Sequence, residues 1–387
     1  MKKTHIKFLY ILINYLNIMK EDRIVEYKIE HTNTGNFRNL FEVLGQVLHE
    51  VRLTHIKPLK PVRNDEDSNS ESESSDKEED TDKDDSDKDN SNDSESNSES
   101  ESEKDPKKKI NDKKKAILGK KPIQWDNSKK DQGGIKILEI NDFKSIIVHV
   151  RLHAEQFYKF DCKYDSYTIG LEPQTMFNFI KNIDKEGVMT VYINENKKQI
   201  MNIELNNQEK KNKSTYEFKL MDLNENKHEI PPPQFDVIVE MKTDEFHNMC
   251  KEMHTHGKYM AIVCTEKKIE FRCKGNSGVI KKEFENGGSV MISLKSDGKK
   301  TSEPKIISEV YDLQNITAFN KCRSLCTYIQ LLLKNKYPMF VRYEVATLGV
   351  MQVGFVPVNE DNINKNMNYS EKNDQFYTEP TLKMKSI

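Results

Sequence analysis

The stretch TYEFKLMDLNENKHEIPPP, residues 215–233, divides the chain into two halves. It begins as a short strand over 215–220 and ends in three consecutive prolines, which neither donate to a β-ladder nor continue a helix. The residues between these ends are mostly polar, as is typical of a linker between folded units. The stretch therefore separates two candidate folded units.

The two halves repeat one order of predicted strands and helices. The first half predicts strands at 24–30, 135–140, 145–152, 157–162, 168–171, 188–193 and 199–205, with a helical run from Phe37 to Leu48 and a helix at 173–183. The second half predicts strands at 236–241, 260–264, 269–273, 278–284 and 351–357, with helices at 243–254 and 316–325. The chain is thus predicted to be α+β, with two copies of one mixed unit.

A long charged segment interrupts the first copy. Residues 64–105 hold 20 acidic residues against 4 lysines, a net charge of −16, so the rest of the chain carries +14 within the total of −2. Residues 106–121 add a basic run of eight lysines and Asp112. We expect residues 60–132 to form a disordered acidic and basic insertion in a loop, because closure entropy grows only slowly with loop length. The positive remainder fits a polyanionic partner.

The N-terminal apolar run and the cysteines carry the expectations on membrane association and redox compartment. The apolar run over 8–19 is too short to span a bilayer and lacks a small-residue cleavage site, so residues 1–22 are interpreted as an N-terminal extension. No membrane partner is expected. The cysteines contain no CxxC pair, which predicts reduced thiols in an intracellular compartment.

No motif predicts catalysis. A phosphate loop, a nucleophile elbow and paired carboxylates at strand ends are all missing from the sequence, so we do not expect an enzyme. One cluster has metal-ligand residue types, but four ligands on one helix cannot surround a tetrahedral zinc. Neither a metal nor another cofactor is therefore predicted for His247, Cys250, His254 and His256.

The linker carries a resemblance to a known family. Residues 216–223, YEFKLMDL, followed by Ile230-Pro231, resemble the interdomain connector of the eukaryotic and viral proliferating cell nuclear antigen family. Residues 134–152 are similar to the first strand pair of that family, 245–257 to its third helix and 338–357 to its closing strands. The resemblance implies a DNA-clamp fold, with two similar domains per chain that place β-sheets outside and two helices each on the lining of a ring.

The resemblance also implies an organisation and a function. It divides the chain into an extension (1–22), a first clamp domain (23–220) interrupted by 60–132, a connector (221–233), a second clamp domain (234–358) and a flexible tail (359–387). Three copies would form a homotrimeric ring around double-stranded DNA and bind it without reading its sequence. The implied partners are DNA polymerase, other proteins with clamp-binding peptides, and a clamp loader. The implied location is the nucleus, or a cytoplasmic replication site if the chain is viral.

Three sets of site residues follow from the resemblance. Basic residues on the lining helices would face DNA, where weak phosphate contacts permit sliding: Arg38, Lys181, Lys185, Lys251, Lys321 and Arg323. A groove for client peptides would be formed by Ile140, Lys144, Ile147, His228, Ile230, Pro338, Val356 and Pro357. Subunits would pair edge to edge, through Phe179 and Tyr216 on one side and Cys250, Met253, Gly278 and Ile280 on the other.

Two departures and two alternatives accompany this interpretation. His228 replaces an aliphatic residue and Gly354 replaces a tyrosine of the family's groove, which predicts a larger and wetter pocket. The chain could instead be one subunit of a checkpoint-type heterotrimeric clamp. It could also bind basic proteins through its acidic run and use the clamp fold as a scaffold. The mass of the assembly in solution distinguishes a homotrimer from the first alternative. Deletion of 64–105 tests the second, because a binder of basic proteins would lose its ligand whereas a clamp would still stimulate DNA polymerase.

Overall fold

Three antiparallel sheets form the framework of the computed structural model, which describes residues 23–59, 62–63, 133–183, 187–207, 209–223, 235–294 and 306–358. The predicted insertion, N-terminal extension and tail lie almost wholly outside these residues. Among the described residues, no helix is long and apolar enough to cross a membrane.

The largest sheet has nine strands and runs through both halves of the chain. Its central junction is the antiparallel pair β19–β5, in register from Gly349 opposite Leu152 to Phe355 opposite Ile146. In spatial order the strands are β15 (Met291–Leu294), β11 (Val237–Lys242), β17 (Tyr328–Leu333), β18 (Met339–Val345), β19 (Gly349–Phe355), β5 (Ile146–His153), β4 (Gly134–Ile140), β2 (Val51–Ile56) and β7 (Ser166–Leu171).

Each half adds a smaller sheet of its own. The first half has six strands in the order β10 (Asn212–Lys219), β9 (Ile200–Asn207), β8 (Gly187–Asn194), β1 (Arg23–Ile29), β6 (Lys159–Cys162) and β3 (Val62–Arg63). The second half has four, in the order β14 (Gly278–Glu285), β13 (Lys268–Gly275), β12 (Tyr259–Cys264) and β16 (Ile307–Asp312). Strands β10 and β14 are therefore end strands of their sheets.

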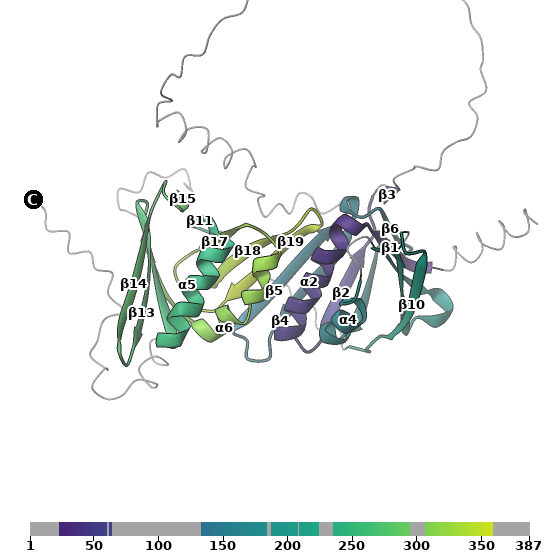
Figure 1. Ribbon diagram of the computed structural model, residues 1–387, viewed down its shortest axis with the longest axis horizontal. Helices are drawn as coiled ribbons and strands as arrows, with labels where there is room; N and C mark the ends of the chain where they lie inside the picture. The colour runs from purple at the N-terminus through teal and green to yellow at the C-terminus, as the bar shows by residue number, and fades with distance from the viewer. Residues whose placement is uncertain are drawn as a thin grey trace, which may run out of the picture. The chain divides into compact units, whose positions relative to one another are not determined.

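The helices lie along one side of the nine-stranded sheet, in front of its strands in Figure 1. They are α2 (His31–Val47), α4 (Pro173–Ile180), α5 (Thr243–His256) and α6 (Leu313–Thr317), and short 3₁₀ turns occur at η2 (Ala154–Gln156), η3 (Glu195–Lys197) and η4 (Asn320–Ser324). Helix α2 buries Phe37, Leu40, Phe41 and Leu44, which recur at helical spacing and explain why this segment packs as a helix.

The helix predicted over 316–325 is wrong in its bounds. The helix begins at Leu313, because the carboxylate of Asp312 accepts a hydrogen bond from the backbone N–H of Gln314 at 2.8 Å. It ends at Thr317, whose hydroxyl donates to the carbonyl of Leu313 at 2.9 Å, a bond that competes with continuation of the helix. The chain then continues into η4.

Alternation along the strands separates two faces of the nine-stranded sheet. In β18, for example, Met339, Val341 and Tyr343 belong to the main core with the helices, whereas Phe340 belongs to a separate cluster. We call the face that carries Phe340, opposite the helices, the outer face. Because side chains alternate with a period of two, each outer row consists of directly paired residues from neighbouring strands.

Two buried histidines make the stability of the fold sensitive to acid. Burial lowers the pKa of His55 to about 4, and burial together with the charge of Arg323 lowers that of His247 to about 4. The unfolded chain binds these protons near pH 6.5, whereas the folded chain does not. Stability is therefore complete above pH 6.5 and is lost as the pH falls toward 4, by up to about 3 kcal/mol for each histidine.

We expect His55→Phe to flatten the fall of Tm between pH 6.5 and 4, because the aromatic stack on Tyr27 can be kept while one titrating group is removed. Scanning calorimetry across this range provides the measurement. His256→Gln, at an exposed histidine of α5, is the matched control and should leave the slope unchanged. Identical slopes for His55→Phe and the wild type would contradict the assignment.

Candidate functional site

The helices of the two halves form one continuous surface. Helix α2 contacts α4 within the first half and η4 of the second half, and α5 contacts α6. The predicted DNA-facing residues Arg38, Lys181, Lys251, Lys321 and Arg323 all lie on or directly beside these elements, with their side chains exposed or half-buried. Lys185 lies outside the described residues.

Two of these cations are already paired with acidic residues. The Lys321 Nζ lies 2.7 Å from the Glu42 Oε1, which joins η4 to α2. The Arg323 Nε donates to the Asp244 Oδ1 at 2.8 Å, and its Nη1 donates to the Asn248 Oδ1 at 3.0 Å. These contacts balance the two charges: the Lys321–Glu42 pair links the two halves, and the Arg323 contacts hold η4 to α5 within the second half.

The remaining cations are spread thinly. Within the described part of the chain, Arg38, Lys181 and Lys251 form no ion pair, and they come from three different helical segments. Spacing of this kind provides weak, sequence-independent attraction for a phosphate backbone rather than a tight binding site. His31, His254 and His256 are also exposed on these helices, and in the sequence His254 and His256 were considered only as metal-ligand types.

The end strand β10 carries an aromatic cluster. The ring of Phe179 on α4 packs edge-on against Tyr216 at 5.6 Å and against Phe218 at 5.5 Å between ring centroids. Phe179 and Tyr216 are half-buried, so each still presents apolar surface at this end of the six-stranded sheet. The structure thus brings together the two residues predicted for one side of a subunit contact.

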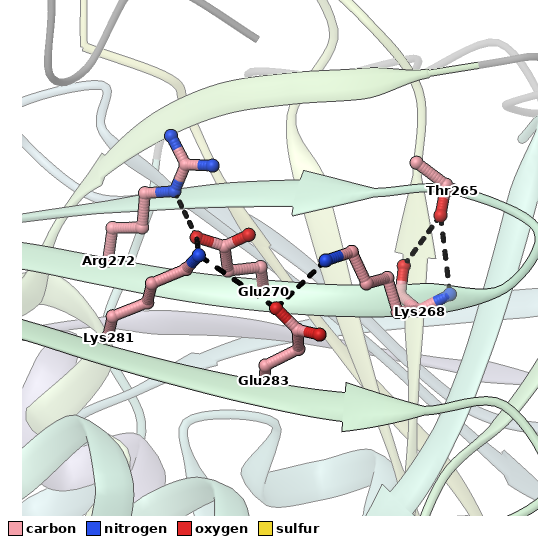
Figure 2. A network of polar contacts seen from close by, with 6 residues as sticks. All are labelled: Thr265, Lys268, Glu270, Arg272, Lys281 and Glu283. Atoms are coloured by element: carbon pink, nitrogen blue, oxygen red, sulfur yellow. Dashed lines mark hydrogen bonds and ion pairs between the residues drawn. The ribbon is translucent and has the colours of Figure 1, made fainter. Parts of the chain in front are cut away.

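The other end strand, β14, is fixed to β13 by a ladder of charges (Figure 2). Lys281 Nζ lies 3.0 Å from Glu270 Oε1, and Lys268 Nζ lies 2.9 Å from Glu283 Oε2, while Arg272 also binds Glu270. Burial alone would raise the pKa of Glu270, but hydrogen bonds from Arg272 and Lys281 outweigh it and hold the pKa below its usual value. The ladder keeps the edge strand in register.

Two of the residues predicted for this side lie inside the chain. Cys250 and Met253 are both 0% exposed, because the apolar face of α5 packs into the core of its own half. Their part in a subunit contact stays a prediction. Gly278 and Ile280 do lie on β14, with Gly278 exposed and Ile280 half-buried against the core.

An apolar row crosses the outer face of the nine-stranded sheet. Consecutive direct pairs between β4, β5, β19, β18, β17 and β11 place side by side Ile140, Ile147, Gly354, Phe340, Leu332 and Ile238. Two residues further along the same strands, the row is mostly polar: Leu138, His149, Gln352, Arg342, Gln330 and Glu240. The apolar row is therefore a bounded stripe rather than one part of a general apolar face.

The predicted groove residues gather at one end of this stripe. Ile140 and Ile147 are half-buried direct partners, and Val356 continues β19 beside them, with its backbone N–H donating to the carbonyl of Ser145 at 3.0 Å. Pro338 directly precedes β18, and Pro357 follows Val356. Lys144 is exposed in the turn between β4 and β5. His228 and Ile230 lie outside the described residues, so their roles stay predictions.

Comparison with known proteins places this geometry in a family. The family model for the proliferating cell nuclear antigen N-terminal domain matches residues 108–228, and that for the C-terminal domain matches 229–358. The chain belongs to the proliferating cell nuclear antigen family. The α+β clamp fold expected from the resemblance is thereby confirmed. Residues 23–59 precede the matched range, yet β1 lies between β8 and β6, and β2 between β4 and β7.

Relatives include viral and animal proteins. The probable DNA polymerase sliding clamp of Acanthamoeba polyphaga mimivirus is 30% identical over 237 residues, which are 60% of this chain and 49% of that protein. The probable DNA polymerase sliding clamp 1 of Paramecium bursaria Chlorella virus 1 is 21% identical over 58% of this chain and 84% of its own length. Proliferating cell nuclear antigen 2 of Drosophila melanogaster is 21% identical over 65% of this chain and 92% of its own length. The chain spans about half the length of the mimivirus protein.

The prediction of a larger, wetter pocket at Gly354 is wrong for this member of the proliferating cell nuclear antigen family. A Cβ atom added at Gly354 would lie 2.8 Å from the Cζ atom of Phe340, the direct partner on β18. Phe340 is only 1% exposed and packs on Phe235 and Tyr337, with ring centroids 5.6 and 6.4 Å away. A ring from the neighbouring strand therefore fills the space that a side chain at 354 leaves open.

The residues that fill the space beside Gly354 are Phe235, Tyr337 and Phe340, and none of them was predicted from the sequence. Their signal lies in cross-strand pairing, which spacing along one strand does not reveal.

The cluster of metal-ligand residue types identified in the sequence does not stay together in the structure. His247 is buried and its Nε2 lies 3.1 Å from the Tyr343 hydroxyl, whereas His254 and His256 are exposed. The described residues contain no group of three or more ligands that could hold a metal ion.

Proposed function

We propose that this chain is a DNA sliding clamp, a ring of identical copies that encircles duplex DNA and holds DNA polymerase on it. The observation that carries the proposal is the nine-stranded sheet, which is continuous through both halves and has the helices of both halves on one face. A chain of this design presents helices on one side and sheet on the other. Its family and the names of its relatives support the same conclusion.

Closure of the ring is proposed to use β10 of one copy and β14 of the next. Each is one of the two end strands of its sheet, and edge pairing would satisfy the free backbone groups that a sheet edge otherwise exposes. Because the two edges differ, the contact is head-to-tail and must generate a closed ring or an open filament. We propose three copies per ring, with Phe179 and Tyr216 facing Gly278 and Ile280.

The surface for DNA is proposed to be the helical face. Arg38, Lys181 and Lys251 supply charge that is not balanced by a described acidic partner, and Lys321 and Arg323 exchange their acidic partners for phosphate when DNA is near. We include Lys185 from the sequence. Threading needs no base contacts, so weak attraction suffices and leaves the ring free to slide.

Clients are proposed to bind at the end of the apolar stripe on the outer face. Apolar residues from three strand ends converge there, and a peptide with an aromatic plug gains affinity by burying apolar surface against them. DNA polymerase, other proteins that carry such peptides and a clamp loader are the proposed partners. Sliding clamps of the proliferating cell nuclear antigen family are non-catalytic scaffolds, and we propose no enzymatic activity and no cofactor for this chain.

The deciding experiment tests whether the protein encircles DNA as a closed ring. The protein is loaded with a clamp loader and ATP onto a nicked circular plasmid, and is then challenged with high salt. We expect retention on the circle and release when a restriction enzyme linearises it, because an encircling ring can leave only over an end. Release from the circle at high salt would show ordinary electrostatic binding.

Neither alternative function has an observation in its favour. The relatives carry the names of sliding clamps and of proliferating cell nuclear antigen. The acidic run lies outside the described residues. We propose that the protein acts where DNA is replicated, in the nucleus or in a viral replication site.

A further inference from the structure

An exposed phenylalanine stands at the end of the stripe and belongs to none of the predicted site residues. Phe143 lies in the turn between β4 and β5 and is 88% exposed. Single exposed apolar residues are common on protein surfaces. Phe143 differs from them in the rigidity of the segment that carries it and in its neighbours.

The turn is held rigidly by hydrogen bonds. The Asn141 Oδ1 accepts from the backbone N–H groups of Ser145 at 2.9 Å and Ile146 at 2.8 Å, and its Nδ2 donates to the Ser145 Oγ at 3.2 Å. The Asn141 N–H donates to the Ile146 carbonyl at 3.0 Å, and the Lys144 N–H donates to the Asn141 carbonyl at 2.8 Å. Lys144 adopts φ +53°, the left-handed conformation that closes the turn.

The neighbours of the turn are the proposed client site. Ser145 accepts a backbone hydrogen bond from Val356, whose side chain is 36% exposed, and Ile140 and Ile147 flank the turn in sequence and pair with each other. Phe143 therefore lies in the turn that joins the paired residues Ile140 and Ile147, at the end of the apolar stripe. It lies on neither β10 nor β14, so the proposed ring leaves it uncovered.

We propose that Phe143 is a specificity-determining residue of the client site, and that it binds a large apolar side chain of the client peptide adjacent to the plug. The inference rests on the proposed function and names what that site selects. Since Phe340 fills the space over Gly354 from within, the site can gain further aromatic contact only at its rim. A ring held on a rigid turn loses little conformational freedom when a peptide covers it, so the contact adds to affinity.

Other occupants are less well supported by the structure. Val358, the last described residue, hydrogen-bonds to Val310 of the four-stranded sheet at 2.8 Å, so the tail of the chain begins against a different sheet. A second copy meeting Phe143 to Phe143 would add a contact outside the ring edges. The experiment below distinguishes both from a client peptide.

The test is a double-mutant cycle measured by isothermal titration. The intact protein and its Phe143→Ser variant are titrated with two polymerase-type peptides that share the plug and differ only in the adjacent residue, Phe or Ala. We expect Phe143→Ser to weaken the Phe peptide about tenfold, or about 1.4 kcal/mol, and to leave the Ala peptide within about twofold. Leu59→Ser, at another highly exposed apolar residue, is the matched control and should change neither.

Each other outcome overturns a different statement. If both peptides bind the wild type and Phe143→Ser affects them equally or not at all, Phe143 does not select clients, while the client site stands. If neither peptide binds the wild type, the client site itself is contradicted. If Phe143→Ser instead lowers the mass of the assembly in sedimentation, Phe143 is covered by a second copy. If deleting 359–387 strengthens both peptides only when Phe143 is present, the tail is the occupant.

Discussion

In sedimentation equilibrium the purified protein is expected at about 135 kDa, three chains of 45.2 kDa, and the Tyr216→Asp variant at the mass of one chain. Tyr216 lies on the end strand β10 and packs on Phe179, so a carboxylate there would have to lose its water against an apolar edge. Uncompensated burial of a charge costs several kcal/mol, and a ring contains this contact three times. Assembly should therefore be lost rather than weakened.

The control for this variant is Tyr164→Asp. Tyr164 is also a partly exposed tyrosine stacked on another ring, Tyr167, but it lies in the turn between β6 and β7, on neither β10 nor β14. It should leave the trimer intact. Circular dichroism of both variants checks that the chain stays folded. A wild-type protein that remains a monomer at micromolar concentration would contradict the homotrimer and would favour a heterotrimeric clamp.

Val356→Asp should weaken a polymerase C-terminal peptide by about thirtyfold, on the order of 2 kcal/mol. Val356 is exposed, so the folded chain tolerates the charge. A bound peptide would have to desolvate that carboxylate beside Ile140, Ile147 and Pro338, which are apolar and carry no charge to balance it. Isothermal titration of the peptide against both proteins measures the effect.

Tyr328→Asp tests whether the effect belongs to the stripe. Tyr328 is exposed on the same outer face, on β17, four residues away from the apolar row along its strand. Its substitution should leave the peptide affinity unchanged, and both variants should keep the mass of the wild type. Equal affinities for Val356→Asp and the wild type would place the peptide elsewhere on the protein.

The sequence by itself determined the α+β class and the family. Strand alternation and helical periodicity are local patterns, and the connector at 216–223 is a contiguous motif, so each can be found without knowing what lies opposite. The predicted groove residues Ile140, Ile147, Pro338, Val356 and Pro357 were named in the same way, by position within matching motifs, and the structure places them near one another on one face.

Tertiary structure alone decided which of these side chains are available. Cys250 and Met253 share a helix with exposed Lys251 and His254, and only packing shows that the first two are buried in the core. Glu42 and Lys321 are 279 positions apart, so their pairing depends on how the two halves meet. Gly354 predicted an open pocket because the sequence does not reveal its partner, whereas in the sheet Phe340 lies directly opposite and fills the space. Register between strands is a long-range property, set by the packing of whole sheets rather than by the residues of any one strand.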